Sequence, residues 1–128
     1  MHPLALDQGV GVLPWSPLAR GRLTRPWGEE TARTDTDLVT KAMYKQAEDA
    51  DRAIVGEVGR IADERGVPRA QVALAWVRQQ PAVTAPIVGA TKPHHIDDAV
   101  ASVDVTLTPD ELAALEAPYT PRNPEGFQ

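Results

Sequence analysis

The chain has 128 residues and a net charge of −5, with 42% hydrophobic and 24% charged residues. This composition is typical of one globular domain and excludes an intrinsically disordered chain. The acidic balance disfavours nucleic acid as a partner, since such binders usually present a basic face. The absence of cysteine excludes disulfides and thiolate metal sites. No signal peptide and no apolar run of the about 20 residues that span a bilayer are present, so we expect no membrane contact and a cytoplasmic location.

Residues 9–15 are a short apolar run, Gly-Val-Gly-Val-Leu-Pro-Trp. Such a run predicts a strand that is apolar and buried on both faces, as in a parallel sheet covered by helices. Residues 16–40 show no clean period and predict a long loop, and loops of more than about 12 residues are usually functional or disordered.

Apolar residues at helical spacing predict a helix over residues 51–65, which Gly66 ends. Pro68 is expected in the first turn of a second helix that stops before Pro81. Residues 84–88 predict a second strand.

The short loop 89–92 follows that strand, and Pro93 is expected to start a helix that runs through Val103. A capping box, Thr108-Pro-Asp-Glu, predicts a last short helix. Residues 118–128 have three prolines and predict an irregular tail.

Strands that alternate with helices predict parallel β/α units. Two strands alone cannot make a stable parallel sheet, because both edges expose unpaired backbone groups and apolar faces. The chain, taken as one domain over residues 1–128, therefore predicts part of a larger sheet or barrel.

The loop 89–92 has features of an anion site. It lies between a strand and a helix N-terminus, where backbone N–H groups and the helix dipole favour negative charge. Gly89 and Ala90 allow close approach of a ligand, Thr91 offers a hydroxyl, Lys92 a positive charge, and His95 lies one turn further. In the alternative interpretation, Thr91 only caps the helix and Lys92 is solvated.

Trp15, followed by Ser16 and Pro17, is expected at the carboxyl end of a strand, where α/β barrels place binding groups. A flat aromatic ring there can stack on a ligand ring. In the alternative interpretation, Trp15 is a core residue and Ser16-Pro17 is a turn. The loop arginines, Arg20, Arg22 and Arg25, are either phosphate ligands or solvated side chains.

Several motifs together resemble the aldo-keto reductase family. Residues 11–21, Gly-Val-Leu-Pro-Trp-Ser-Pro-Leu-Ala-Arg-Gly, resemble its seventh-strand motif. Residues 72–77 and 86–93 resemble its penultimate helix and eighth strand, and residues 107–112 resemble its last capped helix. The resemblance runs from about Pro3 to Tyr119.

The resemblance implies an α/β fold in which the chain is the C-terminal fragment of a (β/α)8 TIM barrel. It also implies NADPH, bound extended across the barrel mouth without a Rossmann fold. Trp15 would stack on the nicotinamide. The pyrophosphate would lie against Ser16, Pro17, Leu18, Arg20 and Gly21. The adenosine 2′-phosphate and ribose would lie against Gly89, Ala90, Thr91, Lys92 and His95, and Asp98 would face the adenine. His95 and Ala99 stand where many members carry arginine or glutamine and asparagine, so the preference between NADPH and NADH stays open, with Lys92 favouring NADPH.

By the same resemblance, the family reduces aldehydes and ketones with a tyrosine acid and nearby lysine, aspartate and histidine from earlier strands. The tyrosines and histidines of this chain have no matching context, so we expect no catalytic residue and no metal ligand. They are Tyr44, Tyr119, His2, His94 and His95. Met1 directly before the seventh-strand region predicts a truncated reading frame, a split gene or a fragment.

Three hypotheses follow. The first is the cofactor-binding part of an NADPH-dependent reductase, inactive alone because hydride transfer needs a proton donor, with a small carbonyl substrate in the full-length protein. The second is a non-catalytic nucleotide-binding or interaction module, which pairs with a chain that supplies the missing strands. The third is an unfolded, aggregating relic.

Overall fold

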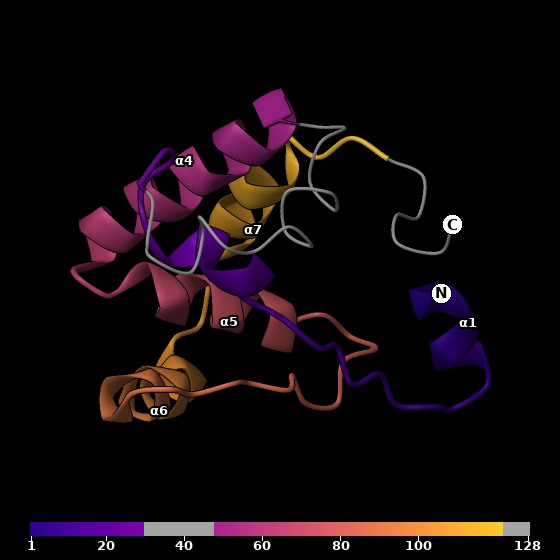
Figure 1. Ribbon diagram of the computed structural model, residues 1–128. Coiled ribbons are helices and arrows are strands. Elements are labelled where there is room, and N and C mark those ends of the chain that lie inside the picture. Colours follow the sequence, from indigo (N-terminus) through magenta and orange to yellow (C-terminus); the bar gives the residue numbers. More distant parts are fainter. Residues whose placement is uncertain (30–47, 122–128) are drawn as a thin grey trace, which may run out of the picture.

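A computed structural model describes residues 1–29 and 48–121 of the chain (Figure 1). The helical elements, in chain order, are α1 His2–Asp7, the 3₁₀ helix η1 Ala19–Thr24, α4 Glu48–Arg65, α5 Arg69–Arg78, α6 Pro93–Ala101, the 3₁₀ helix η2 Ser102–Asp104 and α7 Pro109–Glu116. Helix α5 contacts both α4 and α6, and α7 packs on α4. Figure 1 shows α5 between the α4–α7 pair and α6.

The hydrophobic core lies between α4, α5, α7 and the segment that leads into α7. Its largest fully buried side chains are Ile61 of α4 and Val72 of α5. The other core residues are Val58, Ala62, Ala75, Val105, Leu107 and Leu115. The helical spacing of the apolar residues in α4 accounts for this packing, because it aligns them in one stripe.

The helix predictions are confirmed, with corrections at two boundaries. Gly66 adopts φ +65° after α4, the left-handed conformation that ends helices. Pro68 is the N-cap of α5, with ψ 144°, and not a first-turn residue. The helix that starts at Pro93 ends at Ala101, and the chain continues as the tighter helix η2 to Asp104.

The two predicted strands are not regular strands. Among the described residues, the first predicted strand, 9–15, is joined to the second, 84–88, and to Val83 just before it, only by two isolated parallel bridges. They link Val12 with Val83 and Trp15 with Ile87. Three backbone bonds accompany the bridges: Val12 N to Ala82 O, Thr84 N to Val12 O, and Ile87 N to Pro14 O, at 2.9–3.0 Å. The predicted parallel direction is confirmed, but proline at 14 and 86 removes two backbone donors.

The prediction that these strands are buried on both faces is wrong for the structure. Val10, Leu13, Trp15 and Ile87 are all more than half exposed. A strand pattern that is apolar on both faces needs neighbouring strands and covering helices. Within residues 1–29 and 48–121, the two segments have only each other as a bridge partner.

Two helical elements were not predicted. Helix α1 has no buried residue, so its sequence has no apolar periodicity to detect. The 3₁₀ helix η1 lies inside the predicted loop 16–40, of which residues 30–40 are outside the described part. Helix α7 ends at Glu116, and residues 118–121 of the predicted tail form no helix or strand. None of the described helices is long and apolar enough to cross a bilayer.

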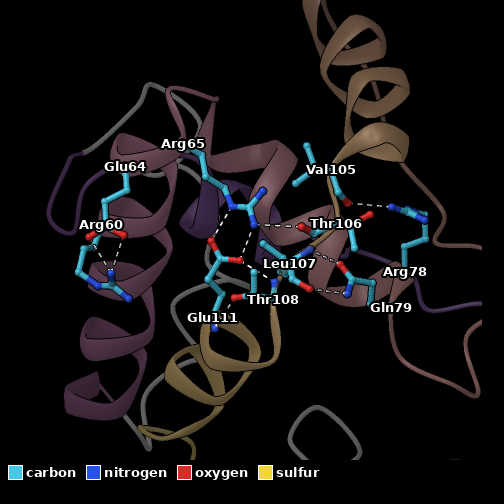
Figure 2. Close-up of polar contacts among 10 residues, drawn as sticks. All are labelled: Arg60, Glu64, Arg65, Arg78, Gln79, Val105, Thr106, Leu107, Thr108 and Glu111. Carbon is cyan, nitrogen blue, oxygen red and sulfur yellow. Dashed lines mark hydrogen bonds and ion pairs between the residues drawn. The ribbon is translucent and has the colours of Figure 1, made fainter.

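The segment before α7 is fixed by side chains from α4 and α5 (Figure 2). Arg65 of α4 makes a two-pronged ion pair with Glu111 and donates to the carbonyl of Thr106. On the other side, Gln79 donates to the Leu107 carbonyl at 3.1 Å and accepts from its N–H at 2.7 Å. These bonds satisfy backbone groups of a segment that belongs to no helix or strand.

Glu111 also completes the predicted capping box, which is confirmed. The hydroxyl of Thr108 accepts from Glu111 N–H, and the Glu111 carboxylate accepts from Thr108 N–H at 2.6 Å. The Arg65 guanidinium, first, and the Thr108 N–H lower the pKa of Glu111 from 4.5 to about 2. A carboxylate whose pKa is lower in the folded state stabilises the fold above its unfolded pKa, and this stability is lost as the pH falls.

We therefore expect Glu111→Gln to lower the free energy of unfolding by about 1–2 kcal/mol at pH 7. The difference between wild type and variant should shrink as the pH falls from about 5 to about 2. Urea denaturation across that range measures it. The control is Glu64→Gln, which removes an ion pair to Arg60 in which both side chains are largely exposed and should therefore leave stability almost unchanged. Equal losses for the two variants would contradict a special role of Glu111.

Candidate functional site

The parallel bridge between Trp15 and Ile87 brings the two predicted binding motifs to the same end of the molecule. The first motif continues from Trp15 into residues 16–21, and the second continues from Ile87 into residues 89–92. Because the two segments run parallel, both loops leave at their carboxyl ends, which is where α/β barrels place their sites. The structure thus brings the two motifs to the same end of the two paired segments.

Trp15 is 64% exposed. The alternative interpretation of Trp15 as a core residue is therefore wrong within the described chain. The backbone of Trp15 is held by the bridge to Ile87, whereas its indole ring is exposed. The ring therefore offers a flat surface to a ligand ring.

The backbone of residues 16–21 adopts an unusual conformation. Ser16, Ala19 and Arg20 have φ of 54°, 48° and 55°, and Gly21 has φ +91°. Non-glycine residues rarely adopt this region, because Cβ crowds the backbone. Local bonds hold the shape: Ser16 O accepts from Ala19 N, its hydroxyl accepts from Arg20 N, and Gly21 O accepts from the Thr24 hydroxyl. With the bond from Gly21 N–H to Leu18 O, the backbone donors of residues 19–21 are all engaged within the loop.

An arginine and tryptophan cluster lies next to this loop, and the sequence analysis missed it. The guanidinium carbons of Arg22 and Arg52 lie 5.3 Å and 5.7 Å from the ring centroid of Trp27. Arg22 also pairs with Asp51 at 3.7 Å. The contacts connect η1 to α4. No local pattern could reveal them, because residues 27 and 52 are far apart in the sequence.

The second loop, residues 89–92, is exposed, and one of its backbone N–H groups donates to a histidine side chain. Gly89, Ala90, Thr91 and Lys92 are all exposed. A Cβ at Gly89 would meet no atom within 4 Å, so the backbone is open to close approach. The Thr91 N–H donates to Nδ1 of His95 at 3.3 Å. His95 therefore lies against the loop, as the resemblance implies.

Helix α6 begins in an unusual electrostatic setting. Its N-cap is Lys92, no side-chain cap bond is present, and its first turn has no acidic residue. The alternative in which Thr91 caps the helix is therefore wrong, whereas the exposure of Lys92 agrees with a solvated side chain. A lysine at a helix N-terminus opposes the helix dipole, which costs about 0.3–1 kcal/mol. A bound anion would offset this cost.

Asp98 has a structural partner. Its Oδ1 accepts from Gln71 Nε2 of α5 at 3.0 Å, and Gln71 is one of the two buried polar residues among those described. The bond connects α6 to α5 and fixes the helix that carries His95. The predicted contact of Asp98 with adenine stays a prediction.

A separate apolar cavity of about 440 Å³ lies among the helices. Of the twelve candidate residues, only Pro17 is among the described residues that line it. Its walls include Ile54, Val58, Trp76 and Tyr119. The cavity and the candidate loops are thus different features of the molecule.

Among the described residues, the other tyrosines and histidines lie at two different places. His2 and Tyr119 line the cavity, and His94 stacks edge-on against His95 with centroids 4.5 Å apart. Tyr44 lies outside the described residues. Within residues 1–29 and 48–121, no three histidine or carboxylate side chains come close enough to hold a metal ion.

Comparison with known proteins agrees with the family that the sequence resembles. Residues 1–119 match the model of the aldo/keto reductase family, and the chain belongs to this family. It is 46% identical over 124 residues to versiconal hemiacetal acetate reductase of Aspergillus parasiticus, covering 95% of this chain and 36% of that protein. It is 36% identical over 137 residues to a probable voltage-gated potassium channel subunit beta of Arabidopsis thaliana, covering 98% and 41%.

The structure of glycerol dehydrogenase from Gluconobacter oxydans superposes with a TM-score of 0.75 at 24% identity. It covers 100% of this chain and 41% of the dehydrogenase chain. This likeness shows the fold: the chain is arranged as part of an aldo-keto reductase barrel. The chain thus spans about a third of the length of the Aspergillus protein and about two fifths of the length of the Arabidopsis protein. The expected partial barrel is thus supported, although regular strands are missing among the described residues.

The donor set fits a nicotinamide dinucleotide, the cofactor class of this family. Trp15 offers an exposed ring, residues 16–21 offer a loop held by local hydrogen bonds, and Lys92 offers a cation in the same loop as the open backbone of Gly89. The chemistry of these groups matches an aromatic ring and two phosphate positions.

The shape of the first loop can be tested at Gly21. A Cβ at this position would lie 3.3 Å from Nη1 of Arg25, at a φ that disfavours side chains. We expect Gly21→Ala to lower the free energy of unfolding by about 1–2 kcal/mol. Gly56→Ala is the matched control: it lies in α4 with nothing within 4 Å and should stabilise by about 0.5–1 kcal/mol. Urea denaturation midpoints measure both changes. If Gly21→Ala left the free energy of unfolding unchanged, the loop would not require this conformation.

Proposed function

We propose that this chain is the cofactor-binding part of an NADPH-dependent aldo-keto reductase that reduces aldehydes or ketones to alcohols. The observation that carries the proposal is the parallel bridge between Trp15 and Ile87 in a chain that belongs to this family. The bridge puts the exposed indole and the two loops at one end. NADPH supplies a hydride to the carbonyl carbon when it is bound.

The phosphate groups of the cofactor are proposed to lie at two places. The pyrophosphate is proposed to lie against the turn 16–21, with Arg20 as the cation of that loop. The loop 89–92 presents Thr91 and Lys92 to the 2′-phosphate. The uncapped start of α6, with a lysine at the N-cap and no acid in the first turn, favours a doubly charged phosphate there. This is the support for NADPH over NADH.

The substrate is proposed to be a small carbonyl compound that enters beside Trp15. The proton donor for the developing alkoxide is proposed to come from outside this chain, because no tyrosine lies in the family's catalytic context here. The chain alone is therefore proposed to bind the cofactor without turnover. The cytoplasmic location and the absence of nucleic-acid and membrane partners stay predictions from the sequence.

Cofactor binding can be measured by tryptophan quenching. We expect saturable quenching by NADPH and weaker binding of NADH. Trp15→Leu should remove most of the quenching that arises at the nicotinamide end, while far-UV circular dichroism stays unchanged, since the Trp15 side chain is largely exposed. A folded chain that binds neither cofactor would contradict the proposal.

Lys92→Met tests the 2′-phosphate directly. It should weaken NADPH binding about tenfold, because a charge-assisted contact is lost, and should leave NADH unchanged. Arg60→Met is the matched control, because Arg60 is exposed on α4 and pairs only with Glu57 and Glu64 among the described contacts. Equal weakening of both cofactors by Lys92→Met would place the lysine elsewhere than at the 2′-phosphate.

A second candidate function is a non-catalytic interaction module, favoured by one observation. Apolar side chains are exposed on the bridge segments and along α6 and η2. They include Val10, Leu13, Ile87, Ile96, Val100 and Val103. We propose that a chain supplying the missing barrel strands covers this surface, since neither bridge segment can form a sheet alone. One relative is itself named as a channel subunit.

Exposure of this surface predicts self-association of the isolated chain. Size-exclusion chromatography with light scattering should show concentration-dependent oligomers for the wild type. Val100→Lys, at a side chain that is 65% exposed, should reduce them, and Glu57→Lys on α4 should not. A monodisperse monomer that melts cooperatively would contradict both this proposal and the expectation of an aggregating relic.

A further inference from the structure

The bond between Thr91 and His95 joins two groups that the proposed function assigns to the same phosphate. The Thr91 N–H donates to Nδ1 of His95 at 3.3 Å. An imidazole nitrogen accepts a hydrogen bond only when it carries no proton. The bond therefore exists only with neutral His95, and while it exists the Thr91 N–H is not available to a ligand.

Protonation of His95 changes two properties of the loop together. Nδ1 becomes a donor, so it can no longer accept from Thr91, and the N–H of Thr91 is released. The ring also gains a positive charge three residues from Lys92. Both changes favour a phosphate dianion, since it accepts hydrogen bonds and is negatively charged. Histidine is the side chain that makes this change between about pH 5 and 8.

We propose that His95 sets the cofactor preference of this loop by its protonation state, closing the Thr91 donor when neutral and adding a second cation for a 2′-phosphate when charged. The inference rests on the proposed cofactor function. The inference extends the proposed function, because it makes the discrimination between NADP(H) and NAD(H) dependent on pH. NAD(H) lacks the 2′-phosphate, so neither the released N–H of Thr91 nor the added charge of His95 should strengthen its binding.

The surroundings of His95 determine what the test must control. Gln71 of α5 binds Asp98, and Arg78 of α5 donates to the carbonyls of Ser102 and Val105. The nearest aromatic titratable group is His94, with ring centroids 4.5 Å apart. The charged and titratable residues on the same segment and on the elements packed against α6 are Lys92, His94, Asp97, Asp98, Arg69, Arg78 and Asp104.

The decisive experiment measures dissociation constants for NADP⁺ and NAD⁺ from pH 8 to pH 5.5, using the oxidised forms because they survive acid. Wild type is compared with His95→Gln, which keeps a hydrogen-bond acceptor but cannot be charged. The 2′-phosphate itself loses charge near pH 6, which weakens binding in every variant. The informative quantity is therefore the ratio between wild type and variant at each pH.

We expect this ratio to rise about tenfold in favour of wild type for NADP⁺ as the pH falls, in line with one added charge-assisted contact. For NAD⁺ the ratio should stay flat. His94→Gln, the matched control one residue away, should keep the wild-type response. An identical pH response in wild type and His95→Gln, or its loss in His94→Gln, would overturn the inference.

A second measurement needs no cofactor and separates the two proposals. The amide ¹H and ¹⁵N shifts of Thr91 should titrate together with the ring of His95 in wild type and stay flat in His95→Gln. If the Thr91 amide does not follow His95, the inference fails even when NADP⁺ binds. If the amide follows His95 but no dinucleotide binds at any pH, the proposed function fails, and the inferred cofactor preference fails with it.

Discussion

The burial of α5 is the constraint on which the rest of the structure depends. Six of its ten residues are buried, including Gln71 and Val72, whereas a surface helix buries one stripe. One side of α5 packs on α4, and the other reaches α6 through the bond between Gln71 and Asp98. Its last turn, through Arg78, and the following Gln79 hold the segment that leads to α7. The position of both candidate loops relative to the core follows from this one helix.

The dependence on α5 also explains why the bridge segments remain attached without a sheet. Val12 and Trp15 meet residues 83 and 87, which follow α5 directly in the chain. The segment that follows α5 is therefore held in place by this buried helix, and two bridges are enough to attach residues 12–15 to it without a full β-ladder. The apolar side chains on both faces still lack the neighbours that their pattern requires, which leaves Leu13 and Ile87 more than half exposed.

Elements that bury a periodic stripe could be predicted from the sequence, and elements held by distant contacts could not. Local sequence patterns predict helix α4, its end at Gly66, and the capping box of Thr108 and Glu111. Helix η1 is not, because its shape depends on left-handed residues such as Ala19, which have no signal in a single sequence. The predicted strands failed for the opposite reason: the local pattern was correct, but strands need partners.

The candidate site divides in the same way. Trp15 and Lys92 could be selected because aromatic and cationic residues after apolar runs predict barrel-mouth binding groups. The partner of Thr91 could not, since spacing alone placed His95 near the loop without showing which atom it engages. The identity of that atom matters. Because Nδ1 of His95 is the acceptor, the availability of the Thr91 N–H depends on the charge of the His95 side chain. A loop with arginine in this position would have a permanent cation and a permanently open donor. Histidine makes both conditional, so the same backbone can favour or disfavour a phosphate without any change in the fold.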